Sequence, residues 1–134
     1  MLIPRIATAH GVVINVAPEV AREMGADEND IADALAAQRR DAVKAECRRR
    51  IYAVASAETQ LNMTSYAAAI ALKPPAERTA EEAGVAAAFM AALAWVSAMR
   101  AAVAAIAGDA ARDIAADASW PACPDQVVAL ASSF

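Results

Sequence analysis

Histidine and cysteine, which often carry catalysis or bind metals, are scarce in this sequence. It has one histidine, His10, and two cysteines, Cys47 and Cys123. Neither a nucleophile–base set nor a metal-ligand spacing can be assembled from them, and no glycine-rich phosphate loop is present. We interpret His10, beside Gly11, as a turn residue. We interpret the cysteines as free thiols, although they could pair if the fold brought them together. The sequence therefore predicts no enzyme, no cofactor and no bound metal.

An acidic stretch, Asp27 to Asp30, has the composition of a calcium-binding loop. That loop needs a glycine at its sixth position, and residue 32 is alanine. We therefore interpret the stretch as the acidic start of a helix, where negative charge complements the helix dipole.

A basic run follows: six of the twelve residues from Arg39 to Arg50 are arginine or lysine, with Asp41 and Glu46 between them. Such a run could bind phosphate, but on a helix it is more typical of a solvated face with local ion pairs or of a protein contact. The net charge of the whole chain is −4, which argues against a general nucleic-acid binder. We expect no nucleic-acid partner.

The composition predicts a helical chain with a thin core. Of the 134 residues, 59% are hydrophobic, but only 4% are aromatic and more than half of the hydrophobic residues are alanine. Alanine favours helices and buries little apolar area. We therefore expect partners or further copies of the chain to complete the core, as in a homo-oligomer.

The clearest element is a long helix from Thr79 to Gly108. Thr79 and Glu82 have the spacing of a capping box, and Gly108 can end the helix. Its apolar stripe comprises Val85, Phe89, Leu93, Val96, Val103 and Ile106. The uncharged part, Ala83 to Met99, approaches the length of a membrane span. Alanine contributes little to insertion and Arg100 follows directly, so we expect a buried helix and no membrane; a small membrane protein is a remote alternative.

A second long helix is predicted from about residue 30 to 61. Its apolar positions are Ile31, Leu35, Val43, Cys47, Ile51, Val54 and Leu61. Residues 62–64 weaken it, Thr64 or Ser65 could cap it again, and Pro74-Pro75 ends the segment. The two long helices, 30–61 and 80–107, are expected to pack as a long antiparallel hairpin in a mainly α fold.

Residues 1–26 differ from the helical remainder, 27–134. Two β-branched runs, Ile3–Ala9 and Val12–Val16, predict a short hairpin, and Glu19 to Met24 predict one helical turn closed by Gly25. A two-stranded hairpin alone is marginal in water. We therefore expect this N-terminal β segment to join a partner.

The helix lengths predict an overhang beside that segment. Residues 80–107 span about 42 Å and would cover only about residues 45–72 of the first helix. The apolar side chains of Ile31, Leu35 and Val43 would then need cover from residues 1–26, from the tail or from another chain.

The C-terminal part is expected to be a short helical tail. We predict one short helix from Asp109 to about Ala118, an end at Trp120-Pro121, and a last turn from Gln126 to Ala131. Trp120 and Phe134 are among the few bulky side chains available to fasten this tail.

Several stretches resemble small tail proteins of phages and prophages. They are RRRIYAVASAETQLNMTSYAAAIAL, LAWVSAMRAAVAAI and DIAADASWPACPDQVVALASSF, together about residues 45–134. They resemble the helical-hairpin domain of tail-fibre-assembly proteins, and PRIATAHGVVINVAPE resembles the β start of tail fibre and fibre-assembly proteins. The resemblance implies no catalytic residues. It implies a tail structural or fibre-associated protein of the virion, made in the host cytoplasm, or alternatively an assembly chaperone absent from the particle.

Together these expectations predict docking onto phage tail or tail fibre proteins through the N-terminal end. The predicted partner-binding residues are Val12, Val13, Ile14, Val16, Ile31, Leu35 and Val43, with the tail around Trp120 and Phe134 as the alternative surface.

Overall fold

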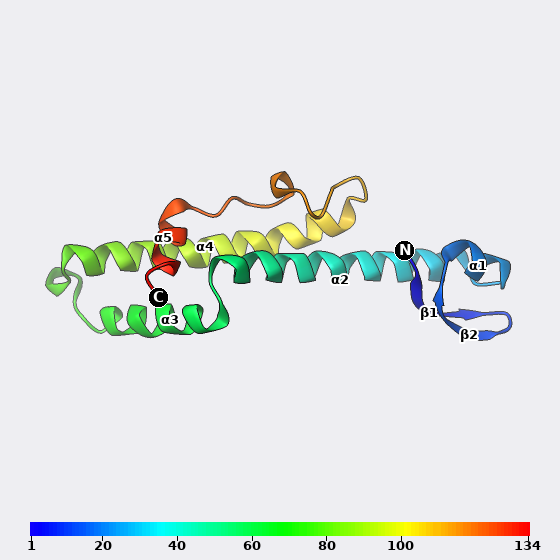
Figure 1. Ribbon diagram of the computed structural model, residues 1–134, viewed down its shortest axis with the longest axis horizontal. Helices are drawn as coiled ribbons and strands as arrows, with labels where there is room; N and C mark the ends of the chain where they lie inside the picture. Colours follow the sequence, from blue (N-terminus) through cyan, green and yellow to red (C-terminus); the bar gives the residue numbers. More distant parts are fainter.

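A computed structural model describes all 134 residues. The molecule is elongated (Figure 1): α4 (Ala80–Gly108) lies beside the C-terminal part of α2 (Glu28–Val54), and each helix extends beyond the other at one end. At one end of α2 lie β1 (Ile3–Thr8), β2 (Gly11–Val16) and α1 (Pro18–Glu23). The predicted mainly helical fold with a short N-terminal β segment and a short C-terminal helix is confirmed.

The start of α4 is built as the sequence predicts. The hydroxyl of Thr79 accepts a hydrogen bond from the Glu82 N–H at 3.1 Å, and the Glu82 carboxylate accepts one from the Thr79 N–H at 2.9 Å. The predicted apolar stripe of α4 faces the core: Ile106 is buried, and Val85, Phe89, Val96 and Val103 pack partly buried against the core. Leu93 is the exception, at 51% exposed. The buried residues of α4 are Ala88, Ala92, Trp95, Met99 and Ile106.

The predicted continuous helix to residue 61 is wrong. The backbone is extended at Ala55, and the Ser56 hydroxyl caps a new helix, α3 (Ala57–Ala71), by accepting from the Thr59 N–H at 3.1 Å. Thr64 does not cap again; its hydroxyl donates to the Gln60 carbonyl within α3. Because α3 is displaced sideways from the line of α2 (Figure 1), Leu61 points to solvent and is 66% exposed.

One main core joins the long helices to the C-terminal part. Helices α2 and α3 each pack against α4, and α5 (Asp125–Ala131) packs against α4 and α3. We call the following buried set the main core: Val43, Cys47, Met63, Ala88, Ala92, Trp95, Met99, Ile106, Trp120, Val127, Leu130 and Ala131.

The segment between α4 and α5 is not the predicted helix 109–118. Asp109 and Asp113 accept hydrogen bonds from the backbone N–H groups of Ala111 and Ala115, two residues further on. These local turns compete with helix formation, and only one 3-10 turn follows, η2 (Asp117–Ser119). A second 3-10 turn, η1 (Pro75–Glu77), links α3 to α4. The predicted last turn is confirmed as α5.

The N-terminal hairpin has a core of its own. β1 and β2 pair antiparallel from Ile3↔Val16 to Thr8↔Gly11, and His10 lies in the turn as predicted. We call the cluster of Ile3, Ile6, Ala21 and Ile31 the N-terminal core. The chain itself therefore supplies cover for the hairpin from α1 and α2.

A close approach fixes the hairpin turn against the end of α1. Gly25 has a φ of +79°, and a Cβ added to it would lie 2.8 Å from the Ala9 Cβ. The Ala9 N–H donates to the Met24 carbonyl at 3.2 Å. Glycine is therefore required at this position.

Between the two cores α2 runs with little cover. Its residues Ala32, Asp33, Ala36 and Ala37 are all exposed. The end of α4 reaches Arg39, whose guanidinium donates to the carbonyl oxygens of Ile106 at 3.0 Å and Ala107 at 3.2 Å. The uncovered stretch is thus shorter than predicted, because the break at Ala55 lets α4 reach further along α2.

Candidate partner-binding surfaces

The outer edge of β2 is unpaired. Val12 and Ile14 are 56% and 69% exposed. No backbone group from Val12 to Val16 forms a backbone hydrogen bond other than those to β1. Along a strand of an antiparallel pair, the backbone groups of alternate residues face the partner strand and face away from it. Thr8 and Gly11 are the pair that closes the turn, so Gly11 and Val13 face β1. The N–H groups of Val12 and Ile14 therefore face the outer edge. This edge could accept another strand.

Asn15 limits the length of that edge. Its φ is +51°, in the left-handed region, so the regular part of β2 is Gly11 to Ile14 rather than Val12 to Val16. Val13 and Val16 are half-buried and pack on the N-terminal core. Of the four predicted β2 residues, Val12 and Ile14 therefore offer side chains to a partner.

The predicted apolar overhang is largely covered by the chain itself. Ile31 is 2% exposed in the N-terminal core, and Leu35 packs half-buried beside it. Val43 is fully buried in the main core under α4. The expectation that Ile31 and Val43 present free apolar surface is therefore corrected: residues 1–26 cover the first and α4 covers the second.

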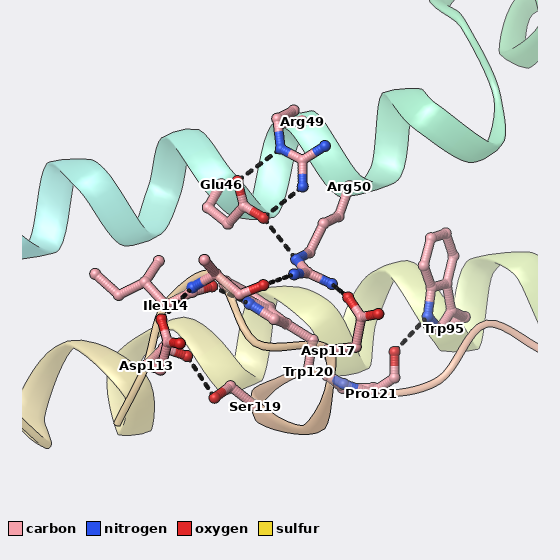
Figure 2. Close-up of polar contacts among 11 residues, drawn as sticks. Glu46, Arg49, Arg50, Trp95, Asp113, Ile114, Asp117, Ser119, Trp120 and Pro121 are labelled. Atoms are coloured by element: carbon pink, nitrogen blue, oxygen red, sulfur yellow. Dashed lines mark hydrogen bonds and ion pairs between the residues drawn. The ribbon is translucent and has the colours of Figure 1, made fainter. Parts of the chain in front are cut away.

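Trp120 is part of a clamp rather than an exposed anchor (Figure 2). It is 6% exposed, and its indole N–H donates to the Ile114 carbonyl at 2.8 Å. Trp95 of α4 donates to the Pro121 carbonyl at 3.1 Å. The two tryptophans therefore fasten the segment after α4, as the sequence predicts for Trp120.

Phe134 remains partly available. It is 40% exposed, and its ring lies 5.7 Å from that of Tyr66 on α3. The structure thus separates the two tail residues, with Trp120 in the main core and Phe134 at the surface. The C-terminus and α5 lie at the opposite end of α2 from β2 (Figure 1).

The basic run on α2 divides into two faces. On one face Glu46 accepts from Arg49 at 2.6 Å and from Arg50 at 2.7 Å, and Arg50 also donates to Asp117 at 2.8 Å. These ion pairs are drawn in Figure 2. Hydrogen bonds from Arg49 and then Arg50 hold the pKa of Glu46 below its usual value, against partial desolvation. The arginines of this face are therefore already paired within the fold.

The other face carries Lys44 and Arg48, which form no hydrogen bond or ion pair within the chain. They line a groove together with Arg100 of α4. The sequence alone does not indicate this groove, because Arg100 reaches it only through the packing of α4 on α2. The signal available in the sequence was the four-residue spacing of Lys44 and Arg48, which places both on one side of a helix.

The two cysteines are free, as predicted. Burial raises the pKa of the Cys47 thiol, and the nearby Arg100 acts in the opposite direction. Burial also raises the pKa of Cys123, and Asp125 adds to the effect. Nowhere do three or more histidine, cysteine, aspartate or glutamate side chains gather as a metal-binding group.

By length and composition, α4 could cross a membrane. Its mean hydropathy reaches 1.8, and 22% of that stretch is buried in the fold. A single such helix is weak evidence, because core helices of water-soluble proteins can have the same length and composition. The expectation of no membrane stays a prediction.

No known protein family matches the chain, and no characterised protein is similar enough to be identified as a relative.

Proposed function

We propose that this protein is a phage tail structural or fibre-associated protein that acts by binding other tail proteins, and that it docks through the outer edge of β2. The sequence resemblance supports the tail assignment. The docking mode is supported by one observation: a strand with an unpaired, uncharged edge that its own chain holds in place.

The chemistry of β2 favours strand addition. Natural edge strands are usually protected by charges, proline or cover from another element. β1 carries Pro4 and Arg5, and it lies against α2. β2 has the sequence GVVINV, without charge or proline, and no further strand pairs with its outer edge. A partner strand would gain main-chain hydrogen bonds and the exposed side chains of Val12 and Ile14.

The helices supply the support in this proposal. We propose that α2, α3 and α4 serve as the antiparallel helical hairpin expected from the sequence, with the N-terminal core carried at its free end. Because α2 runs without interruption from the N-terminal core to the main core, the β2 edge is held away from the bulk of the protein. A projecting edge of this kind suits insertion into a partner.

The test uses two substitutions at one exposed position. Ile14→Pro removes an outward N–H without breaking the ladder to β1, because proline is tolerated where the N–H faces solvent. Ile14→Thr is the matched control, since it removes the apolar side chain and keeps both the N–H and a high strand propensity. Circular dichroism checks that both variants fold.

Mass spectrometry of purified phage particles is the readout. We expect wild type and Ile14→Thr in the particle and at least a roughly tenfold loss for Ile14→Pro, equivalent to about 1.4 kcal/mol of docking free energy. Incorporation of Ile14→Pro at the wild-type level would overturn docking through β2. Absence of the wild-type protein from particles would overturn the virion assignment and favour the assembly chaperone.

A further inference from the structure

A second surface feature lies on the part of α2 away from the N-terminal core. It is a groove of about 420 Å3 between α2 and α4, to which α3 contributes Gln60. Its apolar lining includes Ile51, Val96 and Val103. This volume falls in the range of sites that enclose a small ligand or a few side chains, roughly 300–1,000 Å3.

Three cations border this apolar lining: Lys44 and Arg48 from α2, and Arg100 from α4. None of them forms a hydrogen bond or an ion pair with the chain, and no carboxylate lines the groove. Arg48 does contact an aromatic ring: its guanidinium carbon lies 5.9 Å from the centroid of the Tyr52 ring.

Of the six basic residues from Arg39 to Arg50, three are bound within the fold, and the other three are Arg40, Lys44 and Arg48. Arg39 binds backbone carbonyls at the end of α4, and Arg49 and Arg50 bind Glu46. With 16 acidic residues against 12 basic ones, the chain has enough carboxylates to pair its cations. The groove nevertheless gathers three cations and no acid.

The lining chemistry defines what would fit. An apolar group would bury Ile51, Val96 and Val103, while a carboxylate at its margin would meet the three cations. A nucleic acid suits the groove less well, because its affinity depends on many phosphate contacts and the whole chain is negatively charged at −4. A short acidic and apolar peptide satisfies both parts of the lining.

We propose that this groove binds an acidic peptide segment with apolar residues, supplied by a protein partner. The proposal deepens the proposed docking function, on which it rests for the existence of a protein partner, by naming the partner's chemistry. The groove lies on the helical body and the β2 edge on the N-terminal unit, so the two contacts can be tested separately.

The probe is a random-peptide library displayed on yeast and selected against the full-length protein. The test variant is the triple substitution Lys44→Gln, Arg48→Gln and Arg100→Gln. The matched control is Arg5→Gln, Arg40→Gln and Arg112→Gln, which removes the same charge from side chains outside the groove that also form no hydrogen bond or ion pair. Thermal melting checks that both triple variants fold.

We expect the wild type and the control to enrich peptides that combine aspartate or glutamate with aliphatic residues. The strongest of these peptides should bind the groove variant about tenfold or more weakly, and its affinity for wild type should fall as salt is raised from about 50 to 500 mM. No enriched motif, or equal binding to the groove variant and wild type, would overturn the proposal. Tighter binding of decanoate or of a DNA oligonucleotide than of any selected peptide would also overturn it.

The Ile14→Pro variant separates the peptide-binding test of the groove from the particle-incorporation test of the β2 edge. It should bind the selected peptides as wild type does, whatever its fate in the particle. Failure of the peptide selection would leave the β2 result unaffected, and failure of particle incorporation would leave the peptide result readable.

Discussion

The guanidinium carbon of Arg50 lies 5.6 Å from the centroid of the Trp120 ring. The same side chain donates to Glu46, to Asp117 and to the Ala115 carbonyl, and it is 15% exposed. One arginine of α2 thus holds the segment after α4 against the helices. Its charge-assisted hydrogen bonds and its position over the indole ring hold the same segment, so replacing Arg50 should loosen the packing of the whole segment.

We predict that Arg50→Ala lowers the free energy of unfolding by about 2–3 kcal/mol, because it removes the hydrogen bonds to Glu46, Asp117 and the Ala115 carbonyl and uncovers the indole. Arg49→Ala is the control. Arg49 binds the same Glu46 but is 64% exposed, so its loss should cost under about 1 kcal/mol. Urea denaturation measures both. Equal losses would mean that Arg50 does not fasten the segment.

The pKa of Glu46 gives a pH dependence. The native carboxylate has a lowered pKa, so the unfolded state binds more protons over the window between the native and unfolded values. Its contribution is present above the unfolded pKa of about 4.3 and is lost as the pH falls through the lower native value.

Glu46→Gln should therefore reduce stability by about 1–2 kcal/mol near pH 7 and by progressively less below about pH 4. Denaturant titrations over this pH range measure the effect. Glu23→Gln is the control, since Glu23 forms no ion pair. A constant difference between wild type and Glu46→Gln at all pH values would contradict this account.

The small side chains of α4 are predicted to be needed where they are buried. Ala92 is 8% exposed in the main core, and a larger side chain there must push neighbours apart. We expect Ala92→Leu to cost about 1–3 kcal/mol and to lower the melting temperature. Ala98→Leu, at an exposed position of the same helix, should change it little. A higher melting temperature for Ala92→Leu would show unfilled space at this position.

Cys47 should react slowly in the folded protein. It is 5% exposed, and its raised pKa keeps the thiolate population low at neutral pH. In a Cys123→Ser background, iodoacetamide should modify Cys47 much more slowly than in urea. Arg100→Gln should shift the rate profile to higher pH, because it removes the charge that lowers this pKa. A native rate equal to that of the unfolded chain would contradict the burial of Cys47.

Local sequence signals predicted the elements that local chemistry controls. The capping box at Thr79 and the turn at His10-Gly11 are set by neighbours in the sequence, and both are present. The break at Ala55-Ser56 was missed, because alanine favours helix and no glycine or proline marks it. Ser56 was the available signal, as a residue that caps helices well.

The surfaces were less predictable, because each depends on which elements meet in space. Ile31 is buried only because the hairpin folds back onto α2, and the groove exists only because Arg100 arrives beside Lys44. Helix periodicity assigns a residue to a face, but it does not say what covers that face. Of the two docking features predicted at the N-terminal end, the β2 edge is exposed, whereas the apolar overhang is covered by the chain itself.

The uncovered stretch of α2 acts as a rigid shaft between the two cores. Because it is one continuous helix, it fixes the rotation of the N-terminal core relative to the main core about the helix axis. Each helical residue adds about 1.5 Å and turns the chain by about 100°. One alanine inserted between Ala36 and Ala37 would thus turn the β2 edge by about 100° relative to the groove, with hardly any change in length. Seven inserted residues would lengthen the shaft by about 10 Å and restore the original direction to within about 20°. A partner that engages both surfaces would distinguish these insertions by angle rather than by distance.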